Sequence, residues 1–435
     1  MAPQPNPVHS DETLPTRSEV IIIGGGIIGI TTALELAERG HEVTVLEKGI
    51  IAGEQSSRNW GWVRQMGRAP QEIPLIVEST NIWKTLNKRV EAETGYVQCG
   101  ITYLLNNDKD ITHYSHWSKE YAAPGGIKSE IIGQEKIEQL FPQNTAQWKA
   151  ALYTADDGRA EPQWAATAIA HAARKKGVKI FTNCAARGID TSAGKVSGVV
   201  TEKGLVKSST VVIAGGAWSK HLCDRLGLRL PQLTTISSVL RTKPLEGGSD
   251  GPMVTASGDN YTFRKRQDGG YTISPDFYSY SALTPAHFKY VFDFLPLLVK
   301  NFKTTKMRLD GRFFSEFADI FNTRLDAVSP FEKMRILDPK PVKWMLDLAL
   351  KNLKRDFPIF EPIQTVERWA GVIDVTPDEV PIIDRVAALE GLIISTGYSG
   401  HGFGIGPAAG RLTADIVTGD KPCVNPTPFK YERFS

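Results

Sequence analysis

The sequence predicts a mixed α/β protein (α+β overall) with two domains, one built on a parallel sheet and one on an antiparallel sheet. The chain has 435 residues, more than one hydrophobic core usually serves, so two domains are favoured. Residues 20–48 read as an apolar strand, three glycines, an apolar helix and a second strand. Residues 230–365 are richer in aromatic and alternating patterns, and Asp268-Gly269-Gly270 is typical of a hairpin turn.

Composition and charge exclude several classes of protein. Hydrophobic residues make up 41% of the chain and charged residues 23%, with a net charge of only +3, so neither a nucleic-acid-binding surface nor an acidic tail is indicated. The cysteines lie far apart without a CxxC pair, which argues against a zinc site and a secreted disulfide scaffold. They are Cys99, Cys184, Cys223 and Cys423. We expect no metal and a cytoplasmic location.

The first 17 residues, MAPQPNPVHSDETLPTR, have neither a basic start nor an apolar core. A signal peptide needs both, so we expect a flexible tail at residues 1–17. The longest apolar run is interrupted by the glycines that follow residue 23, and it is well short of the roughly 20 residues that span a bilayer. We therefore expect no transmembrane segment.

The glycines after the first strand predict a binding turn for a dinucleotide. Gly24 allows the tight turn, Gly26 lets a pyrophosphate approach the backbone, and Gly29 lets the helix pack closely on the strand. The unpaired N–H groups of the helix attract phosphate. Glu47 follows at the end of the second strand, where a carboxylate accepts hydrogen bonds from ribose hydroxyls. The sequence thus predicts a Rossmann-like domain and a dinucleotide without a 2′-phosphate.

This turn alone does not separate FAD from NAD, because both place the same adenosine diphosphate on it. Two later segments have a similar character. Residues 210–219, TVVIAGGAWS, read as a strand running into a glycine turn, and residues 391–418 read as a strand, a glycine-rich loop and a helix. Together with the opening turn, they spread one cofactor site over the whole sequence.

With these motifs the sequence resembles the flavoprotein oxidases and dehydrogenases of amino acids, which include D-amino-acid oxidase, glycine oxidase and monomeric sarcosine oxidase. The resemblance runs nearly from end to end. The matching segments are GGGIIG with Glu47, AGEQSSRNWGWVRQ at 52–65, VVIAGGAWS at 211–219, WAGVIDVTPDEVPIID at 369–384 and GYSGHGFGIGPAAG at 397–410. The first is shared with many dinucleotide binders, and the last two are much more specific.

The resemblance implies a Rossmann-like FAD-binding domain of the glutathione-reductase type, with extended FAD whose isoalloxazine ring lies at the border of two domains. It also implies which residues contact FAD. Carried over motif by motif, they are Gly24, Gly26, Ile28, Gly29, Glu47, Lys48, Ser56, Ser57, Arg58, Asn59, Gly61, Trp62, Ala186, Ala214, Gly215, Trp218, Gly371, Gly402, Phe403, Gly404 and Ile405. Relatives with covalent flavin use a cysteine at the position of Gly371 or a histidine in the early segment. Neither is present here, so noncovalent FAD is expected.

Residues 402–405 are expected to act on the flavin through their backbone. Their N–H groups would face the flavin pyrimidine oxygen, with the dipole of the following helix behind them. A positive field there stabilises the negative charge at N1 and O2 when the ring accepts a hydride, as an oxyanion hole does. The alternative, that these glycines only make a tight turn, leaves their density unexplained.

The remaining segments divide between the two domains. The predicted FAD-binding domain comprises residues 18–95, 156–229 and 366–435. The predicted substrate domain is discontinuous, comprising residues 96–155 and 230–365, and is built on an antiparallel sheet with helices. This division places a substrate cleft at the domain junction.

The segment 339–358 has the pattern of an amphipathic helix, with Trp344, Met345, Leu348 and Leu353 on one face and lysines on another. Two interpretations stay open. The helix lies on a membrane or a partner subunit, as electron transfer to a quinone would require, or it covers the substrate domain. The second is favoured.

Oxidation of an amino acid at a flavin needs a cation for the carboxylate and a way to keep the amine neutral. Planar Arg is the preferred partner because it makes two parallel hydrogen bonds. Arg64 and Arg264 rank before Arg266 and Arg324, although each could instead be a surface charge. No strong base is obligatory, because hydride can leave a deprotonated amine as the imine forms.

The resemblance also shows two departures from the family pattern. Gly404 replaces a lysine that binds carboxylate in sarcosine oxidase, and the arginine of glycine oxidase's LRPGT-like motif is replaced within GVIDVTPD. The carboxylate clamp has therefore moved. His401 and Tyr398 could touch the amine or carboxylate. Tyr261 could form a drying aromatic wall with neighbouring aromatic residues, or these could simply be core.

The sequence therefore predicts FAD-dependent oxidation of a small amino acid or secondary amine that is sarcosine-, iminodiacetate-, glycine- or D-amino-acid-like. Hydride passes from Cα to flavin N5, the imine hydrolyses, and molecular oxygen reoxidises the flavin to give H2O2. Two alternatives stay open: an amino-acid dehydrogenase that passes electrons to a quinone or partner protein, and a non-catalytic flavin-binding subunit. No nucleic-acid partner is expected, and the oligomeric state stays open.

Overall fold

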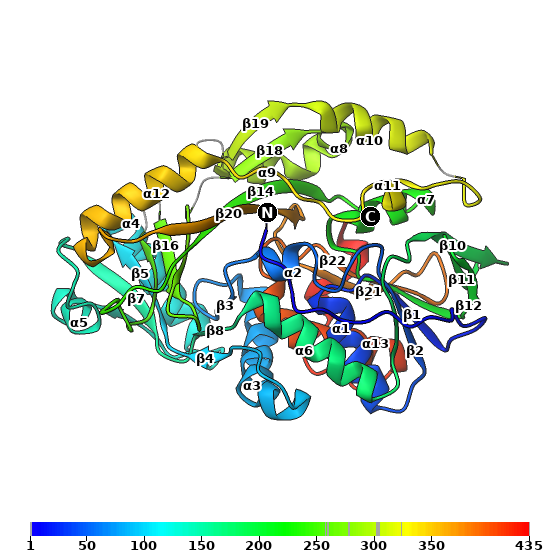
Figure 1. Ribbon diagram of the computed structural model, residues 1–435, viewed down its shortest axis with the longest axis horizontal. Coiled ribbons are helices and arrows are strands. Elements are labelled where there is room, and N and C mark those ends of the chain that lie inside the picture. The colour runs from blue at the N-terminus through cyan, green and yellow to red at the C-terminus, as the bar shows by residue number, and fades with distance from the viewer. Residues whose placement is uncertain are drawn as a thin grey trace.

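The computed structural model describes residues 2–256, 258, 261–276, 279–301, 305–322 and 324–434. Within these residues the chain forms two large sheets with helices packed around them (Figure 1). In the view of Figure 1, the parallel sheet and its helices occupy the lower right, and the larger sheet extends over the left and the top. The mixed α/β class predicted from the sequence is confirmed.

The first sheet has six strands in the order β21-β22-β13-β1-β2-β9. Its strands are β1 (Val20–Ile23), β2 (Val43–Leu46), β9 (Lys179–Phe181), β13 (Thr210–Ile213), β21 (Ile382–Arg385) and β22 (Leu392–Thr396). Neighbouring strands are parallel except β21, which is antiparallel to β22. Every residue of β1 is buried, because helices or strands cover both faces, and this explains its continuous apolar run.

Four helices pack against one another beside this sheet: α1 (Ile27–Glu38), α3 (Ile73–Val90), α6 (Pro162–Lys175) and α13 (Gly402–Thr418). In Figure 1, α1 lies between α6 and α13. Helices α1 and α13 cross so closely that a Cβ on Gly410 would lie only 2.2 Å from the Thr31 hydroxyl oxygen. That hydroxyl donates to the carbonyl of Gly406 at 3.1 Å. The crossing brings the beginnings of the first and last long helices together.

Two small antiparallel sheets accompany the parallel one. They comprise β10 (Ala186–Ser192), β11 (Lys195–Thr201) and β12 (Gly204–Lys207), and β3 (Trp62–Val63), β8 (Gly158–Arg159) and β4 (Val97–Gln98). Shorter helices are α2 (Gln55–Arg58), α4 (Asp108–Trp117), α5 (Gln134–Leu140), α7 (Ser219–Arg225) and α11 (Pro330–Lys333). Strand β3 lies within the cofactor motif of residues 52–65, and the chain continues from it to helix α3.

The second large sheet has ten strands, and nine of them follow the order β19-β18-β14-β17-β16-β15-β5-β7-β6. Its strands are β5 (Ile101–Leu105), β6 (Ser129–Ile132), β7 (Ala150–Thr154), β14 (Leu233–Thr242), β15 (Met253–Ala256), β16 (Tyr261–Lys265), β17 (Tyr271–Ser274), β18 (Ser279–Leu283), β19 (Thr305–Leu309) and β20 (Thr365–Val375). Strand β20 pairs with β14 along its length. The boundary predicted at residue 366 thus lies inside this sheet, and the division into domains stays a prediction.

The hairpin predicted at residues 268–270 is present. Strands β16 and β17 are antiparallel, with Arg264 opposite Thr272, and Gly269 has the positive φ of 80° that a tight turn requires. The predicted amphipathic helix is α12 (Lys343–Asp356), which packs on this sheet as favoured. Its buried face comprises Met345, Leu346, Ala349 and Leu353. Trp344 does not belong to that face, since its side chain is 52% exposed.

Residues 285–321 add α8 (Pro285–Lys289), α9 (Val291–Asn301) and α10 (Gly311–Phe321) beside β18 and β19 at the top of Figure 1. This segment presents large apolar side chains to solvent, and we call them the apolar surface. They are Phe288, Val291, Phe292, Leu295, Val299, Met307, Leu309, Phe314 and Phe317. In the part of the chain that the structure describes, no helix is both long and apolar enough to cross a membrane.

Residues 2–17, for which the sequence predicts a flexible tail, follow a defined course along α6 and β9. The backbone N–H of Asn6 donates to the carbonyl of Gln163 at 3.0 Å. The Asp11 carboxylate accepts from the N–H of Ile180 at 2.7 Å and pairs with Arg174 at 3.2 Å. All four cysteines are free thiols, and the cytoplasmic location stays a prediction.

Candidate functional site

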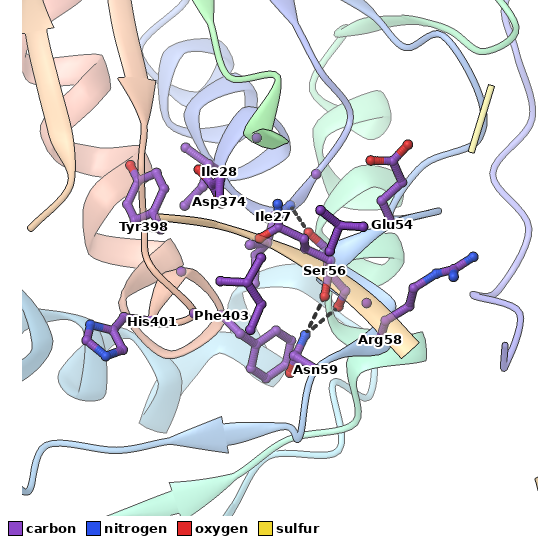
Figure 2. A pocket seen from close by; sticks show the side chains of 18 of the residues that line it. Ile27, Ile28, Glu54, Ser56, Arg58, Asn59, Asp374, Tyr398, His401 and Phe403 are labelled. Carbon is purple, nitrogen blue, oxygen red and sulfur yellow. Dashed lines mark hydrogen bonds between the residues drawn. The ribbon is translucent and has the colours of Figure 1, made fainter. Parts of the chain in front are cut away.

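A cavity of about 580 Å³ runs from the turn between β1 and α1 to the larger sheet. Its lining comes from segments far apart in the sequence, including the turn after β1, residues 46–64, the end of β13, strand β20 and the start of α13. Figure 2 shows Ile27, Ser56 and Asn59 close together, with Phe403 beside them and His401 further along the loop before α13. The volume falls in the range of cofactor and small-ligand sites.

Glycine is required at the turn after β1. Gly24 has a φ of 117°, and a Cβ there would lie 2.3 Å from the carbonyl oxygen of Ala214. A Cβ on Gly29 would lie 2.0 Å from the carbonyl oxygen of Gly24. The predicted roles in turn geometry and close packing are therefore confirmed. The first turn of α1 opens on the cavity, where its Ile27 N–H donates to the Ser56 hydroxyl at 2.9 Å (Figure 2).

Glu47 lies at the end of β2 and lines the same cavity. Its carboxylate oxygens accept from the N–H groups of Gly25 and Gly49, each at 2.7 Å. Burial raises the pKa of Glu47, although Lys48 and these two amides oppose the rise. Lys48 donates to Glu54 at 2.6 Å, and its ammonium lies 4.4 Å from the centre of the Trp218 ring. These contacts fix an acceptor where a ribose hydroxyl is expected.

The segment after Glu54 is held from both sides. Arg58, with only 5% of its surface exposed, donates to Asp338 at 2.6 Å and to the carbonyl of Ala370 at 3.1 Å. The Asn59 amide donates to the carbonyls of Gln55 and Ser56, as the dashed lines in Figure 2 show. These contacts tie helix α2 to strand β20 and keep this stretch against the cavity.

The first turn of α13 is anchored from behind and carries no side-chain cap. Ser79 and Trp83 of α3 both donate to the carbonyl of Gly404, at 2.7 and 2.9 Å. A Cβ on Gly404 would lie 3.1 Å from the carbonyl oxygen of Trp62, so the turn packs directly on β3. Uncapped N–H groups at a helix start favour a negatively charged or carbonyl oxygen. Ile405 N–H is already bonded within the loop, to the carbonyl of His401.

Most residues that the resemblance assigns to FAD line this one cavity. They are Gly24, Gly26, Ile28, Glu47, Lys48, Ser56, Arg58, Asn59, Trp62, Ala186, Ala214, Gly215, Trp218, Gly371, Gly402, Phe403 and Gly404. Gly29, Ser57, Gly61 and Ile405 are not among the lining residues. Gly29 and Gly61 leave room for neighbouring groups, and the carbonyl of Ser57 accepts from Gln163 at 2.5 Å. Their assigned direct contacts with FAD stay predictions.

Arg64 follows β3 and lines the cavity on the side of the larger sheet. Its Nη1 donates to the carbonyl of Met66 at 2.8 Å and to the Tyr103 hydroxyl at 2.5 Å. Among the described residues, none accepts from its Nε or Nη2. Half of the guanidinium fork is therefore available to a carboxylate that enters the cavity.

Arg264 and Tyr261 lie elsewhere, on strand β16 of the larger sheet. Arg264 is 1% exposed and makes two hydrogen bonds to Glu161, at 2.9 and 3.1 Å. Its Nε also donates to the carbonyl of Trp60. Tyr261 is fully buried, and its hydroxyl donates to Asp356 at 3.0 Å. Neither residue lines the cavity. The polar groups of both are already bonded to buried partners within the protein.

His401 and Tyr398 line the cavity at the loop before α13. His401 Nδ1 lies 3.0 Å from a carboxylate oxygen of the fully buried Glu72. Burial lowers the pKa of His401, whereas Glu72 raises it, and the net shift is downward. The Tyr398 hydroxyl is bonded to that of Ser395 at 2.7 Å, so this ring packs the wall with its polar end engaged. Only His401 of these two keeps a polar atom, Nε2, without a described partner.

Several cavity residues escaped the sequence analysis. Arg68, Tyr103, Tyr114 and Asp276 all line the cavity around Arg64. Burial and Arg64 together lower the pKa of Arg68 to about 10. Arg68 stands four residues after Arg64 in RQMGR, and this spacing could have pointed to it. Asp276 follows the segment TIS by one proline. The tyrosines come from β5 and α4, and no motif linked them to the site.

Comparison with known proteins decides the family. A model of the FAD dependent oxidoreductase family matches residues 19–416. The chain belongs to this family. FAD is therefore its cofactor, as predicted, and the glycine cradle at Gly24, the Glu47 acceptor and the uncapped start of α13 fit that molecule. No group of three or more His, Cys, Asp or Glu side chains in the described ranges is arranged to hold a metal ion.

The chain is similar to several members of known activity. The solved L-amino acid deaminase of Proteus myxofaciens, in complex with anthranilate, is 37% identical, with a TM-score of 0.94 over 99% of this chain and 97% of that one. Glycine oxidase of Pseudomonas aeruginosa is 25% identical over 94% of this chain and 97% of its own length. Mitochondrial sarcosine dehydrogenase of Mus musculus is 22% identical over 98% of this chain, which spans only 42% of its length. This member of an oxidoreductase family is thus related to enzymes of amino acids and amines.

Proposed function

We propose that this protein oxidises the α-amine of an L-amino acid to an imine, which water then hydrolyses to an α-keto acid and ammonium. The amino acid loses a hydride from Cα and a proton from nitrogen, and FAD supplies the hydride acceptor. The L-amino acid deaminase of Proteus myxofaciens supports this choice, because it is more similar to this chain, at 37% identity, than the glycine oxidase and sarcosine dehydrogenase described above. Sarcosine-, iminodiacetate-, glycine- and D-amino-acid-like substrates remain the second candidates.

The proposal depends mainly on Arg64. Its guanidinium offers Nε and Nη2 to the cavity while Tyr103 and Met66 hold Nη1. A substrate carboxylate bound to this fork would lie beside β3, on which the first turn of α13 packs. The α-carbon is thereby held near the proposed pyrimidine-binding amides of Gly402, Phe403 and Gly404.

In this proposal His401 takes the proton that the α-ammonium loses. A downward-shifted pKa keeps the imidazole neutral at pH 7, so its Nε2 can accept a proton while Nδ1 donates to Glu72. Tyr398 shapes the wall, and Arg264 and Tyr261 support the fold. Noncovalent attachment of FAD is also proposed, because glycine stands at position 371.

Two electron acceptors remain. Molecular oxygen is the first choice. The apolar surface of α8, α9, β19 and α10 favours the other, a quinone or partner protein that meets this surface, because several large apolar side chains exposed in one part of the chain are typical of an interaction site. Reoxidation of the reduced flavin separates the two: rapid recovery in air with H2O2 supports oxygen, and slow recovery with rapid reduction of a quinone dye supports the other acceptor.

The test of the proposed function is anaerobic reduction of the bound flavin. The purified protein is mixed without oxygen with each L-amino acid, its D-enantiomer, glycine and sarcosine, and absorbance near 450 nm is followed. The proposal expects bleaching by L-amino acids and formation of the α-keto acid. Bleaching by D-amino acids or sarcosine alone would favour the second candidates, and no bleaching by any amine would favour a non-catalytic flavin-binding subunit.

A further inference from the structure

Asp276, which follows β17, brings a carboxylate into the cavity near Arg64. The residue is half-buried, and its Oδ2 is buried without a hydrogen-bond partner among the described residues. Burial raises the pKa of Asp276 well above its usual value, although Arg64 opposes the rise. A carboxylate left unpaired in such a place is costly, so a cationic ligand group would stabilise it.

The surroundings of Asp276 also suit a cation. Tyr103 and Tyr114 line the same part of the cavity, with ring centres 5.6 Å apart in an edge-to-face arrangement. Trp62 extends this wall, with its ring centre 6.4 Å from that of Tyr103. Aromatic faces beside a carboxylate bind organic cations by cation–π attraction and ion pairing together. Within the described chain, Arg64 and Asp276 form no ion pair with each other, so both side chains remain available to a ligand.

We infer, given the proposed oxidation of amino acids, that Asp276 makes this enzyme specific for L-amino acids with a cationic side chain, such as ornithine, lysine or arginine. Arg64 holds the α-carboxylate of such a substrate, and Asp276 pairs with the cation at the far end of its side chain. The aromatic wall of Trp62, Tyr103 and Tyr114 covers the aliphatic part between them.

The alternative partner for Asp276 is the α-ammonium, and the chemistry opposes it. The α-amine must lose its proton before hydride can leave Cα. An anionic carboxylate next to the α-ammonium would raise the pKa of that ammonium and retain the proton. At the far end of the side chain, the same carboxylate strengthens binding without hindering this step.

The variant Asp276→Asn tests the inference, because it removes the charge and keeps the shape. The two substrates are ornithine and norvaline, whose side chains differ by the terminal amine. In the wild type, kcat/KM for flavin reduction is expected to be at least about tenfold higher for ornithine. In Asp276→Asn it is expected to fall at least about tenfold for ornithine and to stay within about twofold for norvaline. Asp347→Asn is the control, since Asp347 pairs with Arg368 on the exposed side of α12, away from the cavity.

Binding without turnover gives a second readout. 2-Methylornithine and 2-methylnorvaline lack the α-hydrogen and are not oxidised, so the flavin difference spectrum reports their dissociation constants alone. We expect the wild type to bind 2-methylornithine at least about tenfold more tightly, and Asp276→Asn to bind both ligands equally.

Two outcomes would overturn the inference while leaving amino-acid oxidation intact. In the first, the wild type prefers norvaline or binds 2-methylnorvaline more tightly. In the second, Asp276→Asn loses activity equally on both substrates, which would place the carboxylate at the α-amine or in a structural role. A wild-type flavin that no amino acid reduces would instead overturn the proposed function itself, and this inference with it.

Discussion

Two arginines, the half-buried Arg64 and the buried Arg264, have similar signals in the sequence and opposite surroundings in the structure. Arg264 on β16 is almost completely enclosed and bonded twice to Glu161, with Arg266 and Arg159 also near that carboxylate. Arg64 after β3 uses one nitrogen on Met66 and Tyr103 and turns the rest toward the cavity. Both were predicted as carboxylate clamps, and both face carboxylates, one within the protein and one expected from the substrate.

The difference shows that the partner of a buried arginine determines its role. A guanidinium whose donors are satisfied by a buried carboxylate stabilises the fold and has no donor left for a ligand. One with unsatisfied donors at a cavity wall is a binding group, since leaving these donors unpaired is costly until a ligand arrives. The predictions below separate these two roles by measuring stability and turnover on the same variants.

The largest expected effect is on stability, in Arg264→Ala. This variant leaves the Glu161 carboxylate buried with its main partner lost, so we expect the free energy of unfolding to fall by about 3–5 kcal/mol. Urea denaturation followed by flavin and tryptophan fluorescence measures the loss. Arg324→Ala is the control, because Arg324 pairs with Asp326 on the surface, and its unfolding should match the wild type. Wild-type stability in Arg264→Ala would mean that the buried pair is not structural.

The next effect is acid sensitivity caused by Glu161. Burial alone would raise the pKa of Glu161, but Arg264 and Arg266 outweigh it and hold the pKa at about 2, below the ordinary 4.5. The pair therefore contributes stability fully above pH 4.5, and we expect about 3 kcal/mol to disappear as the pH falls from 4.5 towards 2. Denaturation midpoints between pH 7 and pH 3 measure this. Glu161→Gln should lose this part of the pH dependence, and a slope unchanged in that variant would contradict the assignment.

Arg64→Ala should act on turnover rather than on folding. Loss of the charge-assisted fork is expected to lower kcat/KM for the amino acid about a hundredfold, equivalent to about 3 kcal/mol of transition-state stabilisation. The flavin content and denaturation midpoint should stay close to the wild type, because Met66 and Tyr103 are the only acceptors of this guanidinium among the described residues. Stopped-flow flavin reduction measures kcat/KM, flavin absorbance measures the flavin content, and urea denaturation gives the midpoint. A variant that unfolds or loses FAD would place Arg64 with Arg264 in the structural class.

The smallest effect is expected for Tyr103→Phe, which removes the hydroxyl that accepts from Arg64 Nη1. One hydrogen bond that positions the clamp is worth about 1 kcal/mol, so kcat/KM should fall about threefold to tenfold, mainly through KM. Steady-state kinetics on the same amino acid measure the change. Tyr96→Phe serves as a control, because Tyr96 stacks on Trp83 beside α3, away from the cavity lining. An equal loss in both variants would show a general effect of the substitution.

The sequence predicted the cofactor half of the molecule well, because local geometry determines it. A Cβ at Gly24 or Gly29 would collide with backbone atoms, so only glycine permits that turn and the motif is readable from the letters alone. The hairpin at residues 268–270 and helix α12 could be predicted for the same reason, because each depends on the residues of its own segment. Trp344 was placed on the wrong face, because the helical pattern alone did not separate it from the buried apolar residues of α12.

The substrate half could not be predicted in the same way, because contacts between distant segments determine it. Whether Arg264 reaches a ligand depends on Glu161, about a hundred residues earlier, and Asp276 reaches Arg64 only through the course of the larger sheet. Tyr261 looked like a cleft residue and is buried against Asp356 of α12. Strand β20 belongs to the larger sheet by its pairing with β14, although its sequence carries a motif of the cofactor half.

The most direct measurement is the second-order rate constant of anaerobic flavin reduction. It is compared between an amino acid and the amine that remains when the carboxylate of this amino acid is removed. The proteins are the wild type, Arg64→Ala and Arg264→Ala. We expect the wild type and folded Arg264→Ala to prefer the amino acid by at least about a hundredfold, and Arg64→Ala to lose nearly all of this preference. A preference that survives in Arg64→Ala and disappears in Arg264→Ala would contradict the assignment of the two arginines.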